Sequence, residues 1–495
     1  MTPYESLIAL YRDKCLLESA AGVLGWDERT YMPPKGSALR SDQMALLAKL
    51  THEKLTMPRI GELLGTLEAG ALDADQAVNV REIRRVYDRA VKMPARLVEE
   101  IARTTTRAQG VWQEARAKND FPAFAPWLEK IVALKREEAQ AVGYKNSPYD
   151  ALLDEYEPGM TAKAVTKIFA DVRAELAPLV AQISASPKKP RRDLLTRAFT
   201  LDRQHIFGQA AAAAIGFDFA AGRLDVTTHP FCSGMGPGDC RLTTRYSLHE
   251  FNQGCFGILH EAGHGIYEQG LDPAHFGTPL GQACSLGIHE SQSRLWENQV
   301  GRGRPFWEHF FPRAQQTFPG VLDDVSLEDW MFALNAVERS FIRVEADEAT
   351  YNLHIILRFE LEQALMTGDL KPADVNGAWN EKFRSVFDLT PPSDAQGCLQ
   401  DIHWSMGGLG YFPTYTLGNL FAAQFMAAAR RDLPGLDDDF RRGRFQRLKT
   451  WLNDKIHRQG QRHRPADLCQ IITGAPLGHK ALLDSLRGKY TEYYG

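Results

Sequence analysis

The sequence predicts a mainly α-helical protein, and three observations support this fold class. Long stretches repeat apolar residues at positions i, i+3, i+4 and i+7 among charges and alanines, which is the spacing of a buried helical face. Only one short region alternates in the way that a β-strand does. No internal repeat or low-complexity linker divides the 495 residues, so we expect residues 1–495 to form a single domain.

The periodic stretches place the predicted helices along the chain. They cover residues 5–24, 40–70, 75–118, 124–142, 162–185, 326–367 and 440–458. Segments that contain proline interrupt them at 31–36, 145–150, 156–160 and 186–192, because proline cannot continue a helix and favours turns. We therefore expect long helices joined by short connections.

One region predicts β-structure. The segments RLDVTTHPF (223–231) and CRLTTRYS (240–247) alternate and are rich in threonine and valine. Between them lies SGMGPGD (233–239), whose glycines and proline are typical of a turn. We expect a β-hairpin or part of a small sheet here.

Charge and hydropathy exclude several kinds of partner. The formal net charge is −4, and no overall basic excess points to nucleic acid. No run approaches the about 18 apolar residues that a membrane-spanning helix needs. The N-terminal residues MTPYESLIALYRDKC carry charges every few positions and show no signal-peptide core. The seven cysteines are scattered without CxxC spacing, which favours a reduced, cytoplasmic setting.

The segment LHEAGHGIYEQG (259–270) carries a candidate metal site. His260 and His264 are spaced by one helical turn, so both imidazoles lie on one helix face and can reach the same ion. Glu261 projects off this axis and can contact a water molecule instead of the metal. The pattern predicts two ligands and a general base for metal-assisted hydrolysis.

The glycines of the same segment bear on its packing. Gly257, Gly263 and Gly265 each weaken a helix by up to about 1 kcal/mol relative to alanine. Their presence predicts that something approaches the helix closely, either a substrate or another helix.

A catalytic zinc ion needs a third protein ligand and an open position. The segment HESQSRLWEN (289–298) offers Glu290 on the next predicted helix. His289 is its neighbour, but adjacent helical residues point about 100° apart. We therefore predict Glu290 as the ligand and expect His289 to be packed or hydrogen-bonded.

Six ordered motifs and one N-terminal segment resemble those of one family. HEAGH and HESQSR are accompanied by WDERTYMPPKG (26–36), HPF (229–231), DCRLTT (239–244), IRVEAD (342–347) and GCLQDIHW (397–404). Together they resemble the M32 metallocarboxypeptidases of the carboxypeptidase Taq type, from about residue 5 to about residue 490.

The resemblance implies a helical, gluzincin-type, saddle-like body with a deep active-site groove and a homodimeric assembly. Residues 1–200 would form a helical groove wall and residues 201–495 the metal-site half. It also implies Zn²⁺, which Co²⁺ can replace, and removal of C-terminal residues from peptides with broad specificity, a terminal proline being disfavoured.

The mechanism expected from the residues begins at the metal. Zn²⁺ lowers the pKa of a bound water to about 7, and Glu261 would accept its proton and pass it to the leaving amine. The negative charge on the carbonyl oxygen needs further donors. His403 and Tyr415, in the glycine-rich segment 388–419, are similar to a pair with this role in related gluzincins. Tyr411 is the alternative to Tyr415.

An exopeptidase also has to recognise a free carboxylate, for which a bidentate arginine is best suited. Arg343 is the first candidate, on a predicted helix where Asp347 follows one turn later and would orient it. Arg241 on the predicted hairpin is the alternative. Gln400 and Asp401 are further candidates, as hydrogen-bond partners of a zinc histidine.

The sequence therefore predicts a zinc-dependent metallocarboxypeptidase that acts on peptides with a free C-terminus. The alternative within hydrolysis is an oligopeptidase of the related helical gluzincins, which would cut internal bonds. A helical binding protein with an inactive site would have lost Glu261 or a ligand, and neither is lost.

Overall fold

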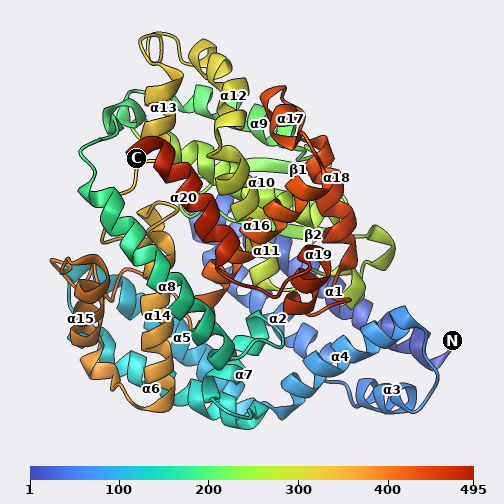
Figure 1. The fold of residues 1–495 in the computed structure, drawn as a ribbon. Coiled ribbons are helices and arrows are strands. Elements are labelled where there is room, and N and C mark those ends of the chain that lie inside the picture. Colours follow the sequence, from blue (N-terminus) through green and yellow to red (C-terminus); the bar gives the residue numbers. More distant parts are fainter. The chain divides into compact units, whose positions relative to one another are not determined.

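Helices make up most of the regular structure, and the strands form one small sheet (Figure 1). The computed structural model describes residues 1–495. It confirms the predicted mainly α-helical class. None of its helices combines the length and apolar character that crossing a lipid bilayer requires.

The chain divides into two compact units, each built from three separate stretches of sequence. The first unit contains Met1–Val91, Pro190–Asn335 and Phe421–Pro476. The second contains Lys92–Lys189, Ala336–Leu420 and Leu477–Gly495. The expectation that residues 1–495 form a single domain, with halves 1–200 and 201–495, remains a prediction.

Besides the sheet, the first unit contains twelve helices. They are α1 (Pro3–Thr30), α2 (Ser37–Leu55), α3 (Pro58–Glu68), α4 (Ala74–Lys92), α9 (Leu201–Ile215), α10 (Phe251–Gly270), α11 (Leu286–Arg294), α12 (Arg304–Thr317), α13 (Leu327–Leu334), α17 (Leu436–Arg441), α18 (Gln446–Lys455) and α19 (Pro465–Thr473). A π-helical segment, η5 (Leu295–Gly301), continues α11. Short 3₁₀ segments are η1 (Pro34–Gly36), η2 (Arg192–Thr196), η3 (Pro273–His275), η4 (Pro279–Gly281) and η8 (His457–Gln459).

The regular structure of the second unit is entirely helical. Its helices are α5 (Ala95–Lys118), α6 (Phe121–Val142), α7 (Pro148–Tyr156), α8 (Ala162–Ala185), α14 (Tyr351–Thr367), α15 (Val375–Phe387) and α20 (Lys480–Tyr494), with the 3₁₀ segments η6 (Arg343–Glu345) and η7 (Pro372–Asp374). The remaining helix, α16 (Pro413–Asp432), has its first residues in this unit and the rest in the other.

Four predicted helices are interrupted, and one of them, 440–458, is broken between the end of α17 at Arg441 and the start of α18 at Gln446. Proline separates α2 from α3 at Pro58 and α4 from α5 at Pro94, because it lacks an N–H and restricts the residue before it. The predicted helix 326–367 is wrong in its middle, since the chain leaves α13 and, apart from the 3₁₀ segment η6, becomes helical again only at α14. Here the carboxylate of Asp347 accepts hydrogen bonds from the backbone N–H groups of Ala349 and Thr350. It therefore acts at a helix start rather than within a helix.

The sheet confirms the predicted β-region but pairs its strands differently. Its order is β1 (Gly222–Val226), β3 (Asp239–Thr244), β2 (Cys232–Gly236). The two predicted strands, β1 and β3, run parallel, whereas the hairpin joins β2 to β3. The reason is that the chain reverses tightly at Gly236 and Gly238, both with positive φ, so most of the expected turn becomes strand.

An aromatic core fixes helix α10, which carries the HExxH motif. Phe251 in its first turn is buried among rings from α9, α12, α13 and the preceding connections. The rings of this cluster belong to Phe199, Phe207, Trp307, Phe310, Phe318 and Trp330. Large aromatic side chains contribute much of the burial energy of a core, so the helix is held rigidly at this end.

Candidate metal centre

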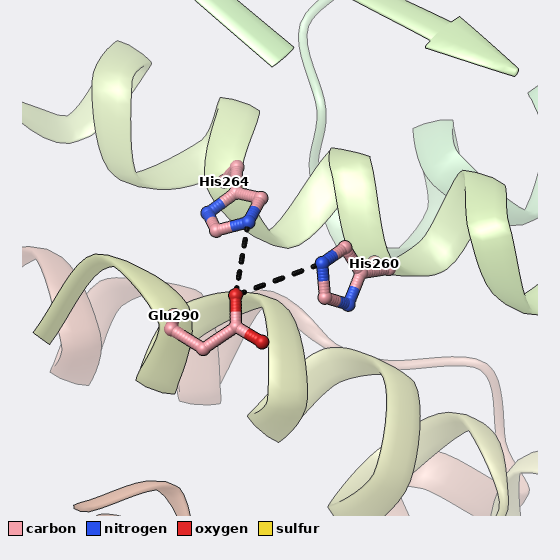
Figure 2. A group of neighbouring side chains, drawn as sticks. All are labelled: His260, His264 and Glu290. Atoms are coloured by element: carbon pink, nitrogen blue, oxygen red, sulfur yellow. Dashed lines mark ion pairs between the residues drawn. The ribbon is translucent and has the colours of Figure 1, made fainter. Parts of the chain in front are cut away.

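Two helices of the first unit bring the predicted ligands together (Figure 2). His260 and His264 project from α10, with ring centroids 5.0 Å apart and ring planes at 85°. Glu290 projects from α11, and its Oε2 lies 3.7 Å from His260 Nε2 and 3.4 Å from His264 Nε2. All three ligand atoms lie within 4.8 Å of one another, so the three residues form one cluster.

A glycine permits the two helices to approach this closely. A β-carbon at Gly263 would lie 2.6 Å from the carbonyl oxygen of Gln292 and 2.6 Å from the α-carbon of Ser293. Both neighbours are backbone atoms of α11, which cannot move aside as a flexible side chain would. Of the two expectations for the glycines, close packing of another helix is therefore confirmed at Gly263.

A methyl group at Gly263 is expected to disturb the cluster. The variant Gly263→Ala should lower the free energy of unfolding by about 1–3 kcal/mol, the usual cost of overpacking. Gly257→Ala is a matched control on α10, because the nearest atom, Thr244 Oγ1, is 3.8 Å away. That variant should be neutral or more stable by up to about 1 kcal/mol. Urea unfolding followed by circular dichroism compares them, and equal stabilities would contradict this assignment.

The donor set fits a divalent cation such as Zn²⁺. With metal–ligand distances of about 2.0–2.2 Å, two ligands of a tetrahedral site lie about 3.3–3.5 Å apart. The two nitrogen–oxygen distances of 3.4 and 3.7 Å are close to that spacing. Two imidazoles and one carboxylate leave a fourth position open, as catalytic sites require.

The electrostatics keep His264 and Glu290 in the protonation states that bind a cation. Burial lowers the pKa of His264 to about 3, so its imidazole is neutral. Burial would raise the pKa of Glu290, but Arg294 and His260 outweigh it and hold this pKa well below its usual value. For His260, burial lowers the pKa, yet the carboxylates of Glu290 and Glu297 shift it upward overall. A negative carboxylate beside a neutral imidazole is the state in which both can ligate a metal.

Glu297 and Arg294 complete the surroundings of the cluster, and sequence reasoning missed both. Glu297 Oε2 lies 2.8 Å from His260 Nδ1, and Arg294 donates from Nε to Glu290 Oε1 at 2.7 Å. Arg294 also donates to Glu297, at 3.2 Å. The predicted partners of a zinc histidine, Gln400 and Asp401, are therefore replaced by Glu297. The sequence signal that could have identified Glu297 was its position two helical turns after Glu290, which places both carboxylates on the same helix face.

Glu261 lies on α10 beside the ligands but is not one of the three clustered groups. Its side chain is buried, and this burial raises the pKa of the carboxyl to about 7. A carboxyl group with such a pKa exchanges protons near neutral pH, which suits a general base.

His289 is hydrogen-bonded, as expected, rather than clustered with the ligands. Its Nδ1 lies 2.5 Å from Nδ1 of His264, and its Nε2 lies 2.7 Å from Oε1 of Glu268. It therefore contacts a predicted ligand from behind, on the side of the ring opposite to the cluster.

The structure changes the surroundings predicted for Arg343. Asp347 was expected to orient it, but the partner is Asp401, whose Oδ1 accepts from Nε at 2.9 Å and from Nη2 at 2.7 Å. Nη1 donates to the hydroxyl of Tyr351 at 2.9 Å. Arg358 holds the other oxygen of Asp401 at 2.7 Å. Each Nη of Arg343 retains one further N–H group.

His403 and Tyr415 form a pair within the second unit. His403 Nε2 lies 3.0 Å from the Tyr415 hydroxyl. Its Nδ1 is buried without a hydrogen-bond partner. Burial, together with the nearby Arg343, lowers the pKa of His403 to about 3, so the imidazole is neutral. The ring of Tyr411 packs against it with centroids 5.4 Å apart, so Tyr411 is a neighbour of the same pair.

A buried carboxylate anchors the loop that carries His403 and leads into α16, where the predicted loop region 388–419 becomes helical and carries Tyr415. Glu362 of α14 accepts hydrogen bonds from Tyr149 Oη, Trp404 Nε1 and the backbone N–H of Gly410. Trp404 directly follows His403 in the chain. Trp404 and Gly410 thus attach both ends of the segment 404–410 to Glu362 of α14. Because this segment directly follows His403, the attachment limits the movement of the imidazole.

Arg241 lies on β3 in the first unit. It donates from Nε and Nη2 to Asp239 at 2.9 and 2.8 Å, and its guanidinium lies 4.4 Å from the ring centroid of Trp26. The side chain is 18% exposed, so a carboxylate could still reach it.

Comparison with known proteins identifies relatives along the whole chain. A sequence model of the family described as carboxypeptidase Taq (M32) metallopeptidase matches residues 6–490. Thermostable carboxypeptidase 1 of Thermus thermophilus is 47% identical, with 100% of each chain covered. Carboxypeptidase 1 of Bacillus subtilis is 39% identical over 96% of this chain and 95% of its own.

Solved structures of carboxypeptidases have the same fold as this chain. The crystal structure of the M32 carboxypeptidase from Deinococcus radiodurans R1 superimposes with a TM-score of 0.98 at 41% identity, covering 100% of both chains. The Pyrococcus furiosus carboxypeptidase gives a TM-score of 0.96 at 35% identity, with 99% of each chain covered.

Proposed function

Because the chain belongs to the carboxypeptidase Taq (M32) metallopeptidase family and is a metallocarboxypeptidase, we propose that Zn²⁺ is its metal and that His260, His264 and Glu290 hold it. The observation that supports this is the convergence of two imidazole nitrogens and one carboxylate oxygen from α10 and α11. Such a mixed nitrogen and oxygen set is typical of catalytic zinc sites. Co²⁺ has similar preferences and is proposed as a substitute.

The proposed chemistry divides between the cation and the chain. A divalent cation polarises a peptide carbonyl and makes a water molecule more acidic. Glu261 accepts a proton from the attacking water and returns it to the nitrogen of the leaving residue. Its buried position favours this exchange, because burial brings the pKa of the carboxyl to about 7.

We assign the stabilisation of the carbonyl oxygen to His403 and Tyr415. Both side chains can donate a hydrogen bond. His403 lies on the loop anchored by Glu362, and Tyr415 lies in the first turn of α16. Donors that are fixed before the reaction stabilise developing charge without reorganising. The role comes from the family resemblance, and Tyr411 remains the alternative donor.

An arginine is proposed to bind the free carboxylate of the substrate. Arg343 and Arg241 are the two candidates, and each is already positioned by an aspartate. An arginine held in this way loses little conformational freedom when it binds a carboxylate. The homodimer and the broad specificity are likewise proposed from the resemblance.

Replacing the arginine that binds the carboxylate should affect only substrates with a free terminus. Arg343→Lys or Arg241→Lys keeps the charge but loses the planar fork. The variant at the true site should lower kcat/KM for a free peptide by about 10- to 100-fold, as expected for hydrogen bonds to a charged group. Cleavage of the same peptide with an amidated C-terminus, already slow, should barely change.

The comparison uses both variants on both peptides, with chromatographic detection of the released product. Each arginine variant serves as the control for the other. Equal losses on the free and amidated peptides would contradict a carboxylate site at that residue. Rapid cleavage of the amidated peptide by the unmodified enzyme would favour the oligopeptidase alternative.

A further inference from the structure

The two proposed histidine ligands are supported in different ways. His260 reaches a carboxylate directly, because Glu297 Oε2 lies 2.8 Å from its Nδ1. His264 instead meets another imidazole, with 2.5 Å between its Nδ1 and Nδ1 of His289. His289 in turn reaches Glu268 Oε1 with its Nε2 at 2.7 Å. His264, His289 and Glu268 thus form a hydrogen-bonded chain, which we call the histidine relay.

The contacts at the two ends of the relay indicate which of the two imidazoles donates the proton between them. Two ring nitrogens at 2.5 Å share one proton, so one donates and the other accepts. If His264 donates from Nδ1, its Nε2 has a lone pair for the cluster, and His289 donates from Nε2 to Glu268. With both imidazoles neutral, the reverse direction would place the lone pair of His289 Nε2 2.7 Å from a carboxylate oxygen. In exchange, His264 would carry its proton on Nε2 and could donate it to Glu290 Oε2 over 3.4 Å. The shorter contact therefore decides for donation by His264.

The far end of the relay is fixed by the sheet. Glu268 follows His264 by one turn of α10, and a β-carbon at Gly234 of β2 would lie 2.2 Å from its Oε2. Only glycine therefore leaves room for this carboxylate against the strand. The His289 ring also packs on Tyr267, with centroids 5.1 Å apart, and the Tyr267 hydroxyl accepts from the backbone N–H of Cys284 at 2.9 Å. The relay is thus held by three elements.

We propose that His289 and Glu268 are positioning residues that keep His264 in the Nδ1–H tautomer and aim its Nε2 at the metal. This inference rests on the proposed metal site. It adds a role for the histidine of the HESQSR motif that does not ligate. Hydrogen-bond partners of a metal-binding histidine typically change metal affinity by about 10- to 100-fold when they are removed.

Two variants of equal shape separate hydrogen bonding from packing. Leucine and asparagine have the same number and branching of side-chain heavy atoms, but only the asparagine amide oxygen can accept the proton of His264 Nδ1. His289→Leu should weaken Zn²⁺ binding by about 10- to 100-fold, and His289→Asn should recover most of that loss. Glu268→Gln removes the charge at the end and should give an intermediate loss. His205→Leu is the control, because His205 is also half-buried and hydrogen-bonded through Nδ1, to Tyr246.

The experiment measures two quantities on the full chain. The first is the Zn²⁺ dissociation constant, from competition with a chromogenic chelator at fixed pH. The second is the tautomer of His264 in metal-free protein, from two-bond ¹H–¹⁵N NMR spectra with ¹⁵N-labelled histidine. The relay predicts the Nδ1–H form in the unmodified protein and in His289→Asn, and its loss in His289→Leu.

The outcomes distinguish this proposal from the metal site itself. Equal Zn²⁺ affinity of His289→Leu, His289→Asn and the unmodified chain would overturn the relay, as would an Nε2–H tautomer of His264 in the metal-free protein. His264→Ala is measured beside them. If this variant loses Zn²⁺ binding while the His289 variants keep it, only the relay is wrong. If it also keeps Zn²⁺ binding, the proposed metal site itself is wrong.

Discussion

Replacing Glu261 by glutamine is expected to lower kcat/KM by about 10²- to 10⁴-fold, the usual contribution of a general base. Glutamine has nearly the same shape but cannot accept a proton, so substrate and metal should still bind. Glu261 stands apart from the three clustered ligand groups, and the Zn²⁺ content of the variant should therefore equal that of the unmodified chain. Steady-state hydrolysis and metal analysis of the same sample measure both quantities.

Glu250→Gln provides the control for this variant. Glu250 precedes α10 and is exposed, so the change has the same chemistry without the buried environment. It should alter kcat/KM by less than about twofold, because exposed substitutions away from a site have small effects. If Glu261→Gln kept nearly full activity, or if it lost its metal, the assignment of Glu261 as the base would be wrong.

Removing the hydroxyl of Tyr415 is the second change with a large expected effect. Tyr415→Phe should lower kcat by about 10²- to 10³-fold, as the loss of one oxyanion donor does in other hydrolases. KM should change little, because the charge on the oxygen develops only in the transition state. Stopped-flow assays with a chromogenic peptide provide both constants.

Tyr411→Phe is the matched control, since Tyr411 and Tyr415 both pack against His403. If Tyr415 is the donor, the Tyr411 variant should retain most of its activity. The opposite ranking would transfer the role to Tyr411. Two fully active variants would exclude a tyrosine hydroxyl from the stabilisation of the carbonyl oxygen.

The sequence was sufficient to place side chains together where their geometry depends on spacing within one helix or on a motif. His260, Glu261 and His264 are fixed relative to each other by helical geometry alone. Glu290 could be proposed because a zinc site needs a third ligand, and Gly263 indicated a close neighbour of the helix, either a substrate or another helix. The predicted helical fold is confirmed for the same reason, since apolar periodicity is a local signal.

Contacts between distant segments were not predictable in the same way. Glu297 lies in the π-helical segment η5, where the helical period changes. Asp401 replaces Asp347 as the partner of Arg343, because the chain leaves the helix between Asn335 and Thr350. Strand β3 pairs with β2 as well as with β1. The pairing with β2 depends on the tight chain reversal at Gly236 and Gly238. Each of these depends on tertiary packing that a local pattern does not contain.

Timed mass spectrometry of a mixed set of peptides tests the central claim most directly. The purified chain is assayed as prepared, after removal of metal with a chelator, and after addition of Zn²⁺ to the stripped protein. We predict successive products that shorten from the C-terminus, their absence after stripping, and their return with Zn²⁺. Undiminished cleavage by the stripped protein, or products that arise from internal bonds, would contradict the account.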